Sequence, residues 1–394
     1  MGVRSVRVAR VGAPAPGATL EGGGMTKRTL MMVAATSAAA VICLGAPAAQ
    51  GAMDAFVGPL HNRTVIASTV PANGDVNPYG VAVVGRSIGR LHQGDVLVSN
   101  FNAASNLQGT GTTIVQISPR GKRTTFASLR SDMLPGRCPG GVGLTTALGV
   151  LRSGWVIVGS LPTSDGSSAT ARAGCLIVLD SRGRAVETLT GGSINGPWDM
   201  ATVDEGDMTT LFVANVLNGT VAAGGATVDR GTVVRITLRS DHGGMPRMTS
   251  EHVIARGFGE HSDPAALVVG PTGLAVSNAG TLYVADSAGN RIAAVPNALT
   301  REHPAWMGRT VTMNGALNVP LGLTLAPNGD VLTVNAGDGR LVETTPGGHQ
   351  VAVRWLDTSG SPAGSGALFG LAVKPNHRAV YFVDDATNQL DLLP

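Results

Sequence analysis

The fold is decided by one stretch in the second half of the chain, Gly270-Pro-Thr-Gly-Leu-Ala-Val-Ser-Asn-Ala-Gly-Thr-Leu-Tyr-Val-Ala-Asp286-Ser-Ala-Gly-Asn290-Arg-Ile-Ala-Ala-Val295. It contains three short runs of apolar and β-branched residues, separated by turns rich in Gly, Asn and Ser. Such runs between turn-forming residues predict β-strands joined by hairpins. The stretch therefore predicts three consecutive antiparallel strands, of which the second ends in Asp286.

The same pattern of two paired strands recurs five more times along the chain. The paired runs lie at 79–84 with 94–100, 143–150 with 154–160, 198–203 with 210–215, 321–325 with 331–335, and 369–373 with 379–384. A third run follows at 113–117, 175–179, 232–236, 291–295 and 340–344, and most units add a fourth, at 123–127, 185–189, 251–255 and 350–354. Repeated four-stranded units are typical of β-propeller blades.

The two ends of the chain complete this pattern. The last unit stops at 389–394 after three strands, whereas a strand with no partner is predicted at 63–68. Pairing these two segments closes a ring and leaves no open sheet edge. The sequence therefore predicts an all-β protein in which residues 53–394 form one six-bladed β-propeller domain, closed by the N-terminal strand of the mature chain.

One unit also resembles a known family. The segment Leu282-Tyr-Val-Ala-Asp286-Ser-Ala-Gly-Asn290-Arg-Ile292 resembles the signature of the NHL-repeat six-bladed propellers, and the chain looks like an exported, bacterial-type member with degenerate repeats. The signature Asp is kept at Asp384 and is replaced at Asn100, Ser160, Asn215 and Asn335. The resemblance covers about residues 60–394 and implies the fold. It leaves the activity open, because this family includes binding scaffolds, lactonase-like hydrolases and amidoglycolate lyase-like enzymes.

The first 52 residues are expected to lie outside this domain. Residues 25–52 have the order of a secretory signal peptide, with Lys27 and Arg28 before an apolar run at 30–44 and small residues after it. That run is shorter than the roughly 20 residues that cross a bilayer. Residues 1–24 are interpreted as an upstream extension or a disordered leader. We expect an exported protein, periplasmic or extracellular, with no membrane span after signal cleavage.

Cysteine usage agrees with export. Of three cysteines, Cys43 lies in the predicted signal peptide, which leaves Cys138 and Cys175 in the mature chain. In an oxidising compartment these two are expected to form a disulfide. Two buried free thiols are the alternative.

The charge distribution disfavours a nucleic-acid partner. The chain has 29 Lys and Arg against 26 Asp and Glu, a net charge of +3. The first 52 residues hold five of these basic residues and one of the acidic residues, so 24 basic and 25 acidic residues remain. The propeller domain is thus nearly neutral, and it lacks the basic surface that binding to phosphate backbones requires.

Polar residues cluster at the turns that enter the first strand and leave the second strand of each unit. These turns share one face of a propeller, which is where we expect a site. The candidate ligand-binding residues are Asn77, Asn100, Trp198 and Asn290. The candidate ligands for a calcium ion, which prefers oxygen donors, are Asp199, Asn215, Asp263, Asp286, Asn335 and Asp384. The alternative is that these residues form turns by bonding to their own backbone.

Two functions remain open. The main interpretation is a monomeric binding or scaffold protein whose polar channel mouth takes a small molecule, a carbohydrate, a peptide or an ion, with no reaction assigned. The alternative is a calcium-dependent lactonase-like hydrolase, in which His261 and Asp263 form an acid/base couple near a calcium-bound water. A catalytic zinc, which the lyase-like members imply, is disfavoured because His261 alone among eight histidines falls on such a turn.

Overall fold

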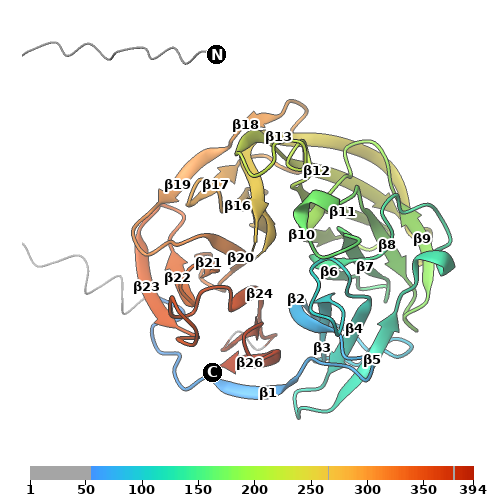
Figure 1. Ribbon diagram of the computed structural model, residues 1–394, viewed down its shortest axis with the longest axis horizontal. Helices are drawn as coiled ribbons and strands as arrows, with labels where there is room; N and C mark the ends of the chain where they lie inside the picture. The colour runs from blue at the N-terminus through green and yellow to red at the C-terminus, as the bar shows by residue number, and fades with distance from the viewer. Residues whose placement is uncertain (1–54, 265, 376–377) are drawn as a thin grey trace, which may run out of the picture. The chain divides into compact units, whose positions relative to one another are not determined.

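The computed structural model describes residues 55–264, 266–375 and 378–394. The predicted leader at 1–24 and signal peptide at 25–52 lie outside these residues. Within them, six antiparallel sheets follow one another around a central axis, and the chain passes through them in sequence order (Figure 1). The described residues thus form the predicted all-β six-bladed propeller, with two short 3-10 helices, η1 (Ser131–Met133) and η2 (Ser168–Thr170).

Each blade is built from four strands taken in order along the chain, apart from the last, which also uses the first strand of the chain. Blade I contains β2 (Val76–Val83), β3 (Val96–Asn102), β4 (Thr113–Ile117) and β5 (Arg123–Ser128). Blade II contains β6 (Leu144–Val150), β7 (Val156–Ser160), β8 (Cys175–Leu179) and β9 (Ala185–Leu189). Blade III contains β10 (Pro197–Asp204), β11 (Met208–Asn215), β12 (Val228–Arg239) and β13 (Arg247–Asp263).

The second half of the ring repeats this plan. Blade IV contains β15 (Pro271–Val276), β16 (Leu282–Asp286), β17 (Arg291–Val295) and β19 (Arg309–Met313). Blade V contains β20 (Pro320–Leu325), β21 (Val331–Asn335), β22 (Arg340–Thr344) and β23 (Gln350–Trp355). Blade VI contains β24 (Leu368–Val373), β25 (Val380–Asp384), β26 (Gln389–Leu393) and β1 (Thr64–Ser68). The fourth strand of blade IV, β19, was not anticipated from the sequence.

The ring closes where the sequence predicts. Strand β1 pairs antiparallel with β26, so that Thr64 lies opposite Leu392 and Ser68 opposite Gln389. Figure 1 shows β1 at the outer edge of the blade that contains the C-terminus. This arrangement ties the two ends of the domain into one sheet.

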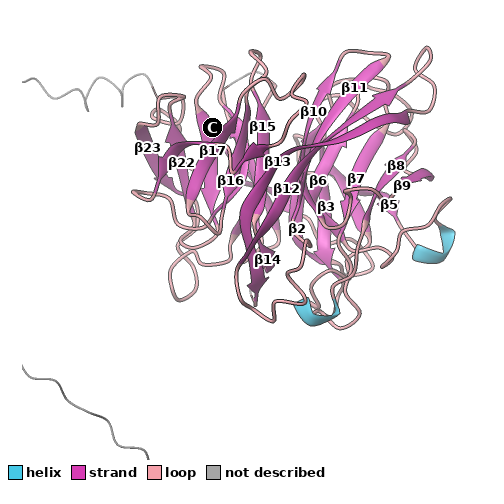
Figure 2. Ribbon diagram, turned by 90° about the horizontal axis from the view of Figure 1, so that it is seen from above, coloured by secondary structure: helices cyan, strands magenta, loops and turns pink. Residues whose placement is uncertain are grey.

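Blade III extends beyond the regular plan. Strand β13 continues to Asp263 and folds back as β14 (Leu267–Val269), with His261 opposite Val269. Figure 2 shows β14 at the lower face of the ring. The short strand β18 (Ala305–Trp306) pairs in parallel with the middle of β13, so that Ala305 lies opposite Ala255. The chain between β13 and blade IV therefore lies over one mouth of the channel.

Every first strand carries a β-bulge near its start. The pairing of first and second strands shifts register between Pro78 and Val81 in blade I and over the same length in blades III to VI, whereas in blade II the shift extends from Leu144 to Leu148, one residue more. A bulge leaves residues unpaired and turns their side chains to new directions. We call the outer bulge residues the mouth positions: Tyr79, Thr145, Trp198, Thr272, Leu321 and Phe369. We call the next residues the throat positions: Gly80, Thr146, Asp199, Gly273, Gly322 and Gly370.

The throat positions bring neighbouring backbones into contact. The first strand of each blade packs against the first strands of both neighbouring blades, so these six strands surround the channel. A Cβ atom on Gly322 would lie 1.9 Å from the carbonyl oxygen of Phe369, and one on Gly370 would lie 2.1 Å from that of Tyr79. Only glycine allows this approach.

The predicted disulfide is present between Cys138 and Cys175, with 5.3 Å between the Cα atoms. It joins the segment before β6 to the third strand of blade II. A disulfide is typical of an oxidising compartment. Among the described residues, no helix is long and apolar enough to cross a membrane.

Candidate functional site

The centre of the channel mouth is apolar. Tyr79 stacks on Phe369 with ring centroids 4.0 Å apart and on Phe101 at 4.4 Å. Trp198 meets Tyr79 edge-on at 5.6 Å, and all four rings are buried. Leu267 from the β13–β14 hairpin packs into the same cluster. We call these five residues the aromatic plug. They fill the place where the sequence suggested an open polar mouth, and the candidate ligand-binding residue Trp198 is part of the plug.

The other three candidate ligand-binding residues hold the turns around the plug. The backbone N–H of Asn77 donates to Asn388 Oδ1 at 2.7 Å. Asn100 donates its side-chain amide to the carbonyl of Thr69 at 3.2 Å, and Asn290 accepts from the N–H of Val319 at 3.0 Å. These bonds link segments that are about 30 to 310 residues apart in sequence. The side-chain oxygens of Asn77 and Asn100 are buried and have no hydrogen-bond partner among the described residues.

Two of the candidate calcium ligands already have a cation beside them. Asp286 Oδ2 lies 2.7 Å from Arg291 Nε, and both side chains are buried. Asp384 Oδ2 lies 3.0 Å from Arg63 Nη1, and the Asp384 side chain is fully buried. In each pair the guanidinium supplies the positive charge that a buried carboxylate needs.

The oxygens of Asn215 and Asp263 are bonded to the backbone. Asn215 Oδ1 accepts from the N–H of Asn195 at 3.1 Å, and Asp263 Oδ1 accepts from the N–H of Ala266 at 2.8 Å. The alternative that polar residues at strand ends bond to nearby backbone therefore describes these two. Asn335 differs: its amide nitrogen donates to the carbonyl of Ala316 at 2.8 Å and to Asp338 at 2.9 Å, whereas its Oδ1 is buried with no hydrogen-bond partner among the described residues.

The carboxylates among the candidate calcium ligands do not belong to a metal-binding cluster of acidic, His and Cys side chains. Within residues 55–264, 266–375 and 378–394, no three or more His, Cys, Asp or Glu side chains are grouped so that they could hold a metal ion. No step of a reaction is therefore assigned to a metal at the mouth.

Asp199 is the one candidate ligand that lies in the channel itself. It occupies a throat position and lines a cavity of about 160 Å³ below the plug. Its Oδ2 accepts the N–H of Leu274 in the neighbouring blade at 3.0 Å. Burial raises the pKa of Asp199 to about 7.

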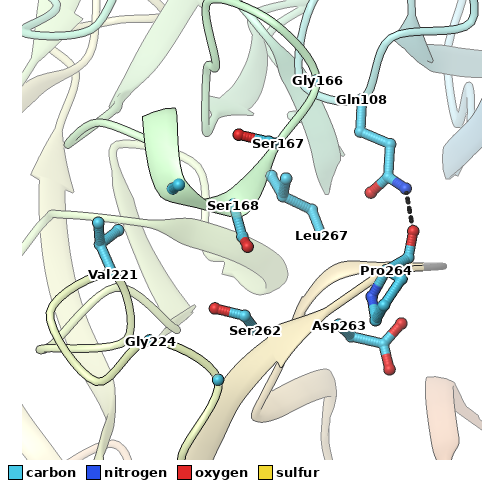
Figure 3. Close-up of a pocket in the computed structure, with 12 residues that line it drawn as sticks. Gln108, Gly166, Ser167, Ser168, Val221, Gly224, Ser262, Asp263, Pro264 and Leu267 are labelled. Atoms are coloured by element: carbon cyan, nitrogen blue, oxygen red, sulfur yellow. Dashed lines mark hydrogen bonds between the residues drawn. The ribbon is translucent and has the colours of Figure 1, made fainter.

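A larger pocket lies beside the plug on the same mouth. Its volume is about 600 Å³ (Figure 3). The pocket is lined by the β13–β14 hairpin and by three loop segments that interrupt the repeat. Its lining residues include Gln108, Ser167, Ser168, Val221, Gly224, Ser262, Asp263 and Leu267. We call this cavity the mouth pocket.

Hydroxyl groups dominate the polar lining of the mouth pocket. In Figure 3 the hydroxyls of Ser168 and Ser262 lie on opposite walls and turn toward the same space. Gln108 donates from Nε2 to the carbonyl of Pro264 at 2.8 Å, which ties the blade I insertion to the hairpin. The carboxylate of Asp263 points away from these two serines in this view. The pocket thus offers neutral hydrogen-bonding groups inside and one carboxylate at its edge.

One member of the candidate acid/base couple, Asp263, lines this pocket. His261 is two residues earlier on β13 and is not among the lining residues; its Nδ1 is 2.9 Å from the carbonyl oxygen of Ser262. Gln108, Ser168 and Ser262 were not among the predicted site residues. The signal that could have found this part of the wall is the unusual length of the segments after β3 and β11, which interrupt the repeat at 102–112 and 217–231.

Comparison with known proteins supports the fold. No family profile and no curated protein sequence matches the chain. Solved six-bladed propellers do match it in structure, among them a gluconolactonase from Xanthomonas campestris with a TM-score of 0.52 and 13% identity, over 83% of this chain and 88% of that one. The NHL-repeat resemblance is thus not confirmed as such, and gluconolactonase-like propellers are a related group that fits.

Two further structures widen this comparison. A calcium-binding protein, regucalcin, from Agrobacterium tumefaciens has a TM-score of 0.52 and 13% identity, over 84% of this chain and 95% of that one. A luciferin-regenerating enzyme has a TM-score of 0.53 and 12% identity, with the same shares covered. At these identities the likeness shows the fold alone.

Proposed function

We propose that this protein is a lactonase-like propeller that binds a small hydroxyl-rich molecule, with a sugar lactone as the first candidate, in the mouth pocket. The observation that carries the proposal is the pocket itself, whose volume of about 600 Å³ suits a small ligand. Its inner wall presents serine hydroxyls and an amide, which pair well with ligand hydroxyls. None of the described residues that line it is positively charged, so a strongly anionic ligand is a poor fit.

Backbone conformation around the plug also supports a site here. Leu267, which lines the mouth pocket, has φ of +63°, and Val319, which lines a smaller neighbouring cavity, has φ of +53°. Bulky side chains rarely adopt this left-handed region, and the cost is of the order of 1–3 kcal/mol per residue. Such strain is concentrated at functional sites in folded proteins.

Binding is tested with the purified full-length mature protein by calorimetric titration with a six-carbon sugar lactone and with its open acid. We expect saturable binding of the lactone and weaker binding of the negatively charged acid. The variants Ser168→Ala and Ser262→Ala should each weaken binding several-fold. Ser250→Ala, on the same strand β13 but outside the pocket, is the matched control. Equal affinity of all four proteins, or no binding by any of them, contradicts the proposal.

Hydrolysis of the bound lactone is the second candidate function. It is supported by the lactonase among the structural neighbours and by Asp263, which lines the pocket two residues after His261 on β13. Turnover is measured as acid release, with and without added calcium or chelator. If the pocket hydrolyses the ring, Asp263→Asn should lower kcat far more than it changes lactone affinity. A protein that binds the lactone and releases no acid would be a binding module on a lactonase-like fold.

A further inference from the structure

A cavity with a charged lining lies in blade I, at the face of the ring opposite the mouth. Its volume is about 340 Å³. It is formed by the segment between β2 and β3 and by strands β4 and β5 with the turn that joins them. Because β2 begins and β3 ends at the mouth, these connections lie at the other end of the strands. We call this cavity the basal pocket; its lining residues are Arg90, His92, Asp95, Gln116, Ser118, Lys122, Thr124 and Phe126.

Arg90 is held in place across two blades. Its Nη2 donates to the carbonyl of Thr125 at 2.6 Å, and its Nη1 donates to the carbonyls of Phe126 and Arg182, each at 3.2 Å. Thr125 and Phe126 belong to β5 of blade I, whereas Arg182 lies in the turn between β8 and β9 of blade II. All three acceptors are neutral, so these bonds orient the guanidinium without balancing its charge.

A second cation without a counter-charge lines the basal pocket. Lys122 lies in the turn between β4 and β5, and its side chain is exposed. In the part of the chain that the structure describes, neither Lys122 nor Arg90 forms an ion pair with a carboxylate. One carboxylate is present among the described lining residues, that of Asp95, which accepts from Gln116 Nε2 at 2.8 Å. With histidine neutral, the lining therefore has a net charge of +1.

The wall of the basal pocket also contains a polar atom that no described protein group satisfies. Gln116 is 4% exposed, and its Nε2 donates to the carbonyl of Arg90 at 3.1 Å as well as to Asp95. Its Oε1 is buried and has no hydrogen-bond partner among the described residues. Such an acceptor gains from a donor that a ligand brings. The hydroxyls of Ser118 and Thr124 line the same pocket and can donate or accept.

We propose that the basal pocket binds a small monocarboxylate that carries hydroxyl groups. Its carboxylate lies between Arg90 and Lys122, which are ordinary partners of a carboxylate, and its hydroxyls bond to Gln116 and to the two hydroxyls of the wall. A single negative charge balances the net charge of the lining, whereas the carboxylate of Asp95 disfavours a ligand with two charges, such as phosphate. The site does not depend on lactone binding, because the basal pocket shares no lining residue with the mouth pocket.

Three probes define the class of ligand. The purified protein is titrated calorimetrically, at constant ionic strength, with a six-carbon sugar acid, with the corresponding sugar alcohol and with inorganic phosphate. We expect the acid to bind saturably and the alcohol, which lacks the charge, to bind about tenfold more weakly. A higher salt concentration should weaken binding of the acid, because the two cations are reached from solvent. Binding of the alcohol as tightly as the acid, or of phosphate more tightly than the acid, contradicts the proposed class.

Two variants and a matched control locate the bound acid. Lys122→Gln removes one cation from the pocket and should weaken binding of the acid about tenfold. Thr124→Val keeps the branched shape, removes one hydroxyl and should weaken binding several-fold. Arg120→Gln removes the same charge from the same turn but outside the pocket, and it should bind the acid as the wild type does. All three side chains are exposed, so each variant should fold. An equal loss in Lys122→Gln and Arg120→Gln would reveal a diffuse charge effect and contradict the site.

Titration of the mouth-pocket variant separates the two sites. Ser168→Ala should leave the Lys122-dependent binding of the acid unchanged, and Lys122→Gln should bind the lactone with the affinity of the wild type. If the acid is lost in Ser168→Ala and kept in Lys122→Gln, it occupies the mouth pocket, and the basal site is contradicted. Absence of acid binding in the wild type overturns the proposal whether or not the lactone binds, so its failure is distinct from a failure of the mouth pocket.

Discussion

Arg63 Nη1 lies 3.0 Å from Asp384 Oδ2, and this pair connects the start of the closing strand to the second strand of the last blade. The same guanidinium reaches Asp391 with Nε at 3.1 Å and Asp357 with Nη1 at 3.4 Å. One guanidinium thus contacts three carboxylates that come from two blades. Its single positive charge does not balance all three, and burial together with the neighbouring carboxylates raises the pKa of Asp384 and that of Asp391. These ion pairs hold the ring closed in addition to the pairing of β1 with β26.

Removing this arginine should destabilise the whole domain. In Arg63→Met the carboxylates of Asp384 and Asp391, both fully buried, lose their counter-charge. Breaking a buried ion pair from one side costs about 3–5 kcal/mol of the free energy of unfolding. Urea denaturation monitored by circular dichroism measures the loss. Arg130→Met, which breaks an exposed pair with Asp132, serves as the control and should unfold at the wild-type midpoint.

The stability of the domain should depend on the protonation of Asp385. Burial, with the neighbouring charge of Asp384, raises the pKa of Asp385 to about 7, above its usual value of 3.8. The folded state therefore holds this proton more tightly than the unfolded state. The resulting stabilisation is fully present below pH 3.8 and is lost as the pH rises through about 7.

Asp385→Asn removes this contribution. The difference in unfolding free energy between variant and wild type should grow in favour of the variant between pH 5 and pH 8, as measured by urea denaturation at a series of pH values. If the difference in unfolding free energy between Asp385→Asn and wild type stays constant from pH 5 to pH 8, the Asp385 carboxyl has the same pKa in the folded and unfolded states, and the prediction is wrong.

The disulfide should stabilise blade II. Cys138 and Cys175 are separated by 37 residues, and closing a loop of this length is worth about 4 kcal/mol in the chain-entropy treatment. The double variant Cys138→Ser and Cys175→Ser should melt at a lower temperature than the oxidised protein and should no longer respond to reductant. Thiol titration of the wild type under denaturant without reductant provides a direct check, because two reactive thiols would contradict the bridge.

The throat glycines should not tolerate a side chain. In Gly370→Ala the new Cβ would lie 2.1 Å from the carbonyl oxygen of Tyr79, which belongs to the first strand of the next blade. Backbone must move to remove this clash, so we expect a loss of several kcal/mol or a failure to fold. Gly85→Ala is the matched control, because nothing lies within 4 Å of its Cβ position. Thermal melting of the two variants should therefore differ clearly.

The sequence alone predicts the blades because strands repeat one pattern of apolar runs and turn residues. The sequence also predicts that the strand at 63–68 pairs with the last unit, because that unit lacks its fourth strand. The sequence does not show the β-bulge in each first strand. In the sequence, Trp198 and Tyr79 look like ordinary residues at the start of a strand. In the structure, the bulge directs their rings into the aromatic plug.

The candidate site is harder to predict for a related reason. Asp and Asn at the end of a strand can bind a ligand or cap a turn, and the residue type is the same in both cases. Their roles depend on a distant partner, as Asp384 depends on Arg63 more than three hundred residues away. The mouth pocket is likewise formed by insertions, whose positions in space are set by loops rather than by the repeat. The sequence locates these insertions and does not show that they meet.

The pairing of β1 with β26 has a consequence for how the chain is made. Because synthesis proceeds from the N-terminus, β1 has no partner until residues 389–393 have been made. Every nascent chain that lacks these residues is an open arc with an exposed sheet edge at each end. The propeller can therefore reach its native topology only after β26 has been synthesised, and any factor that shields such edges should matter most before that point.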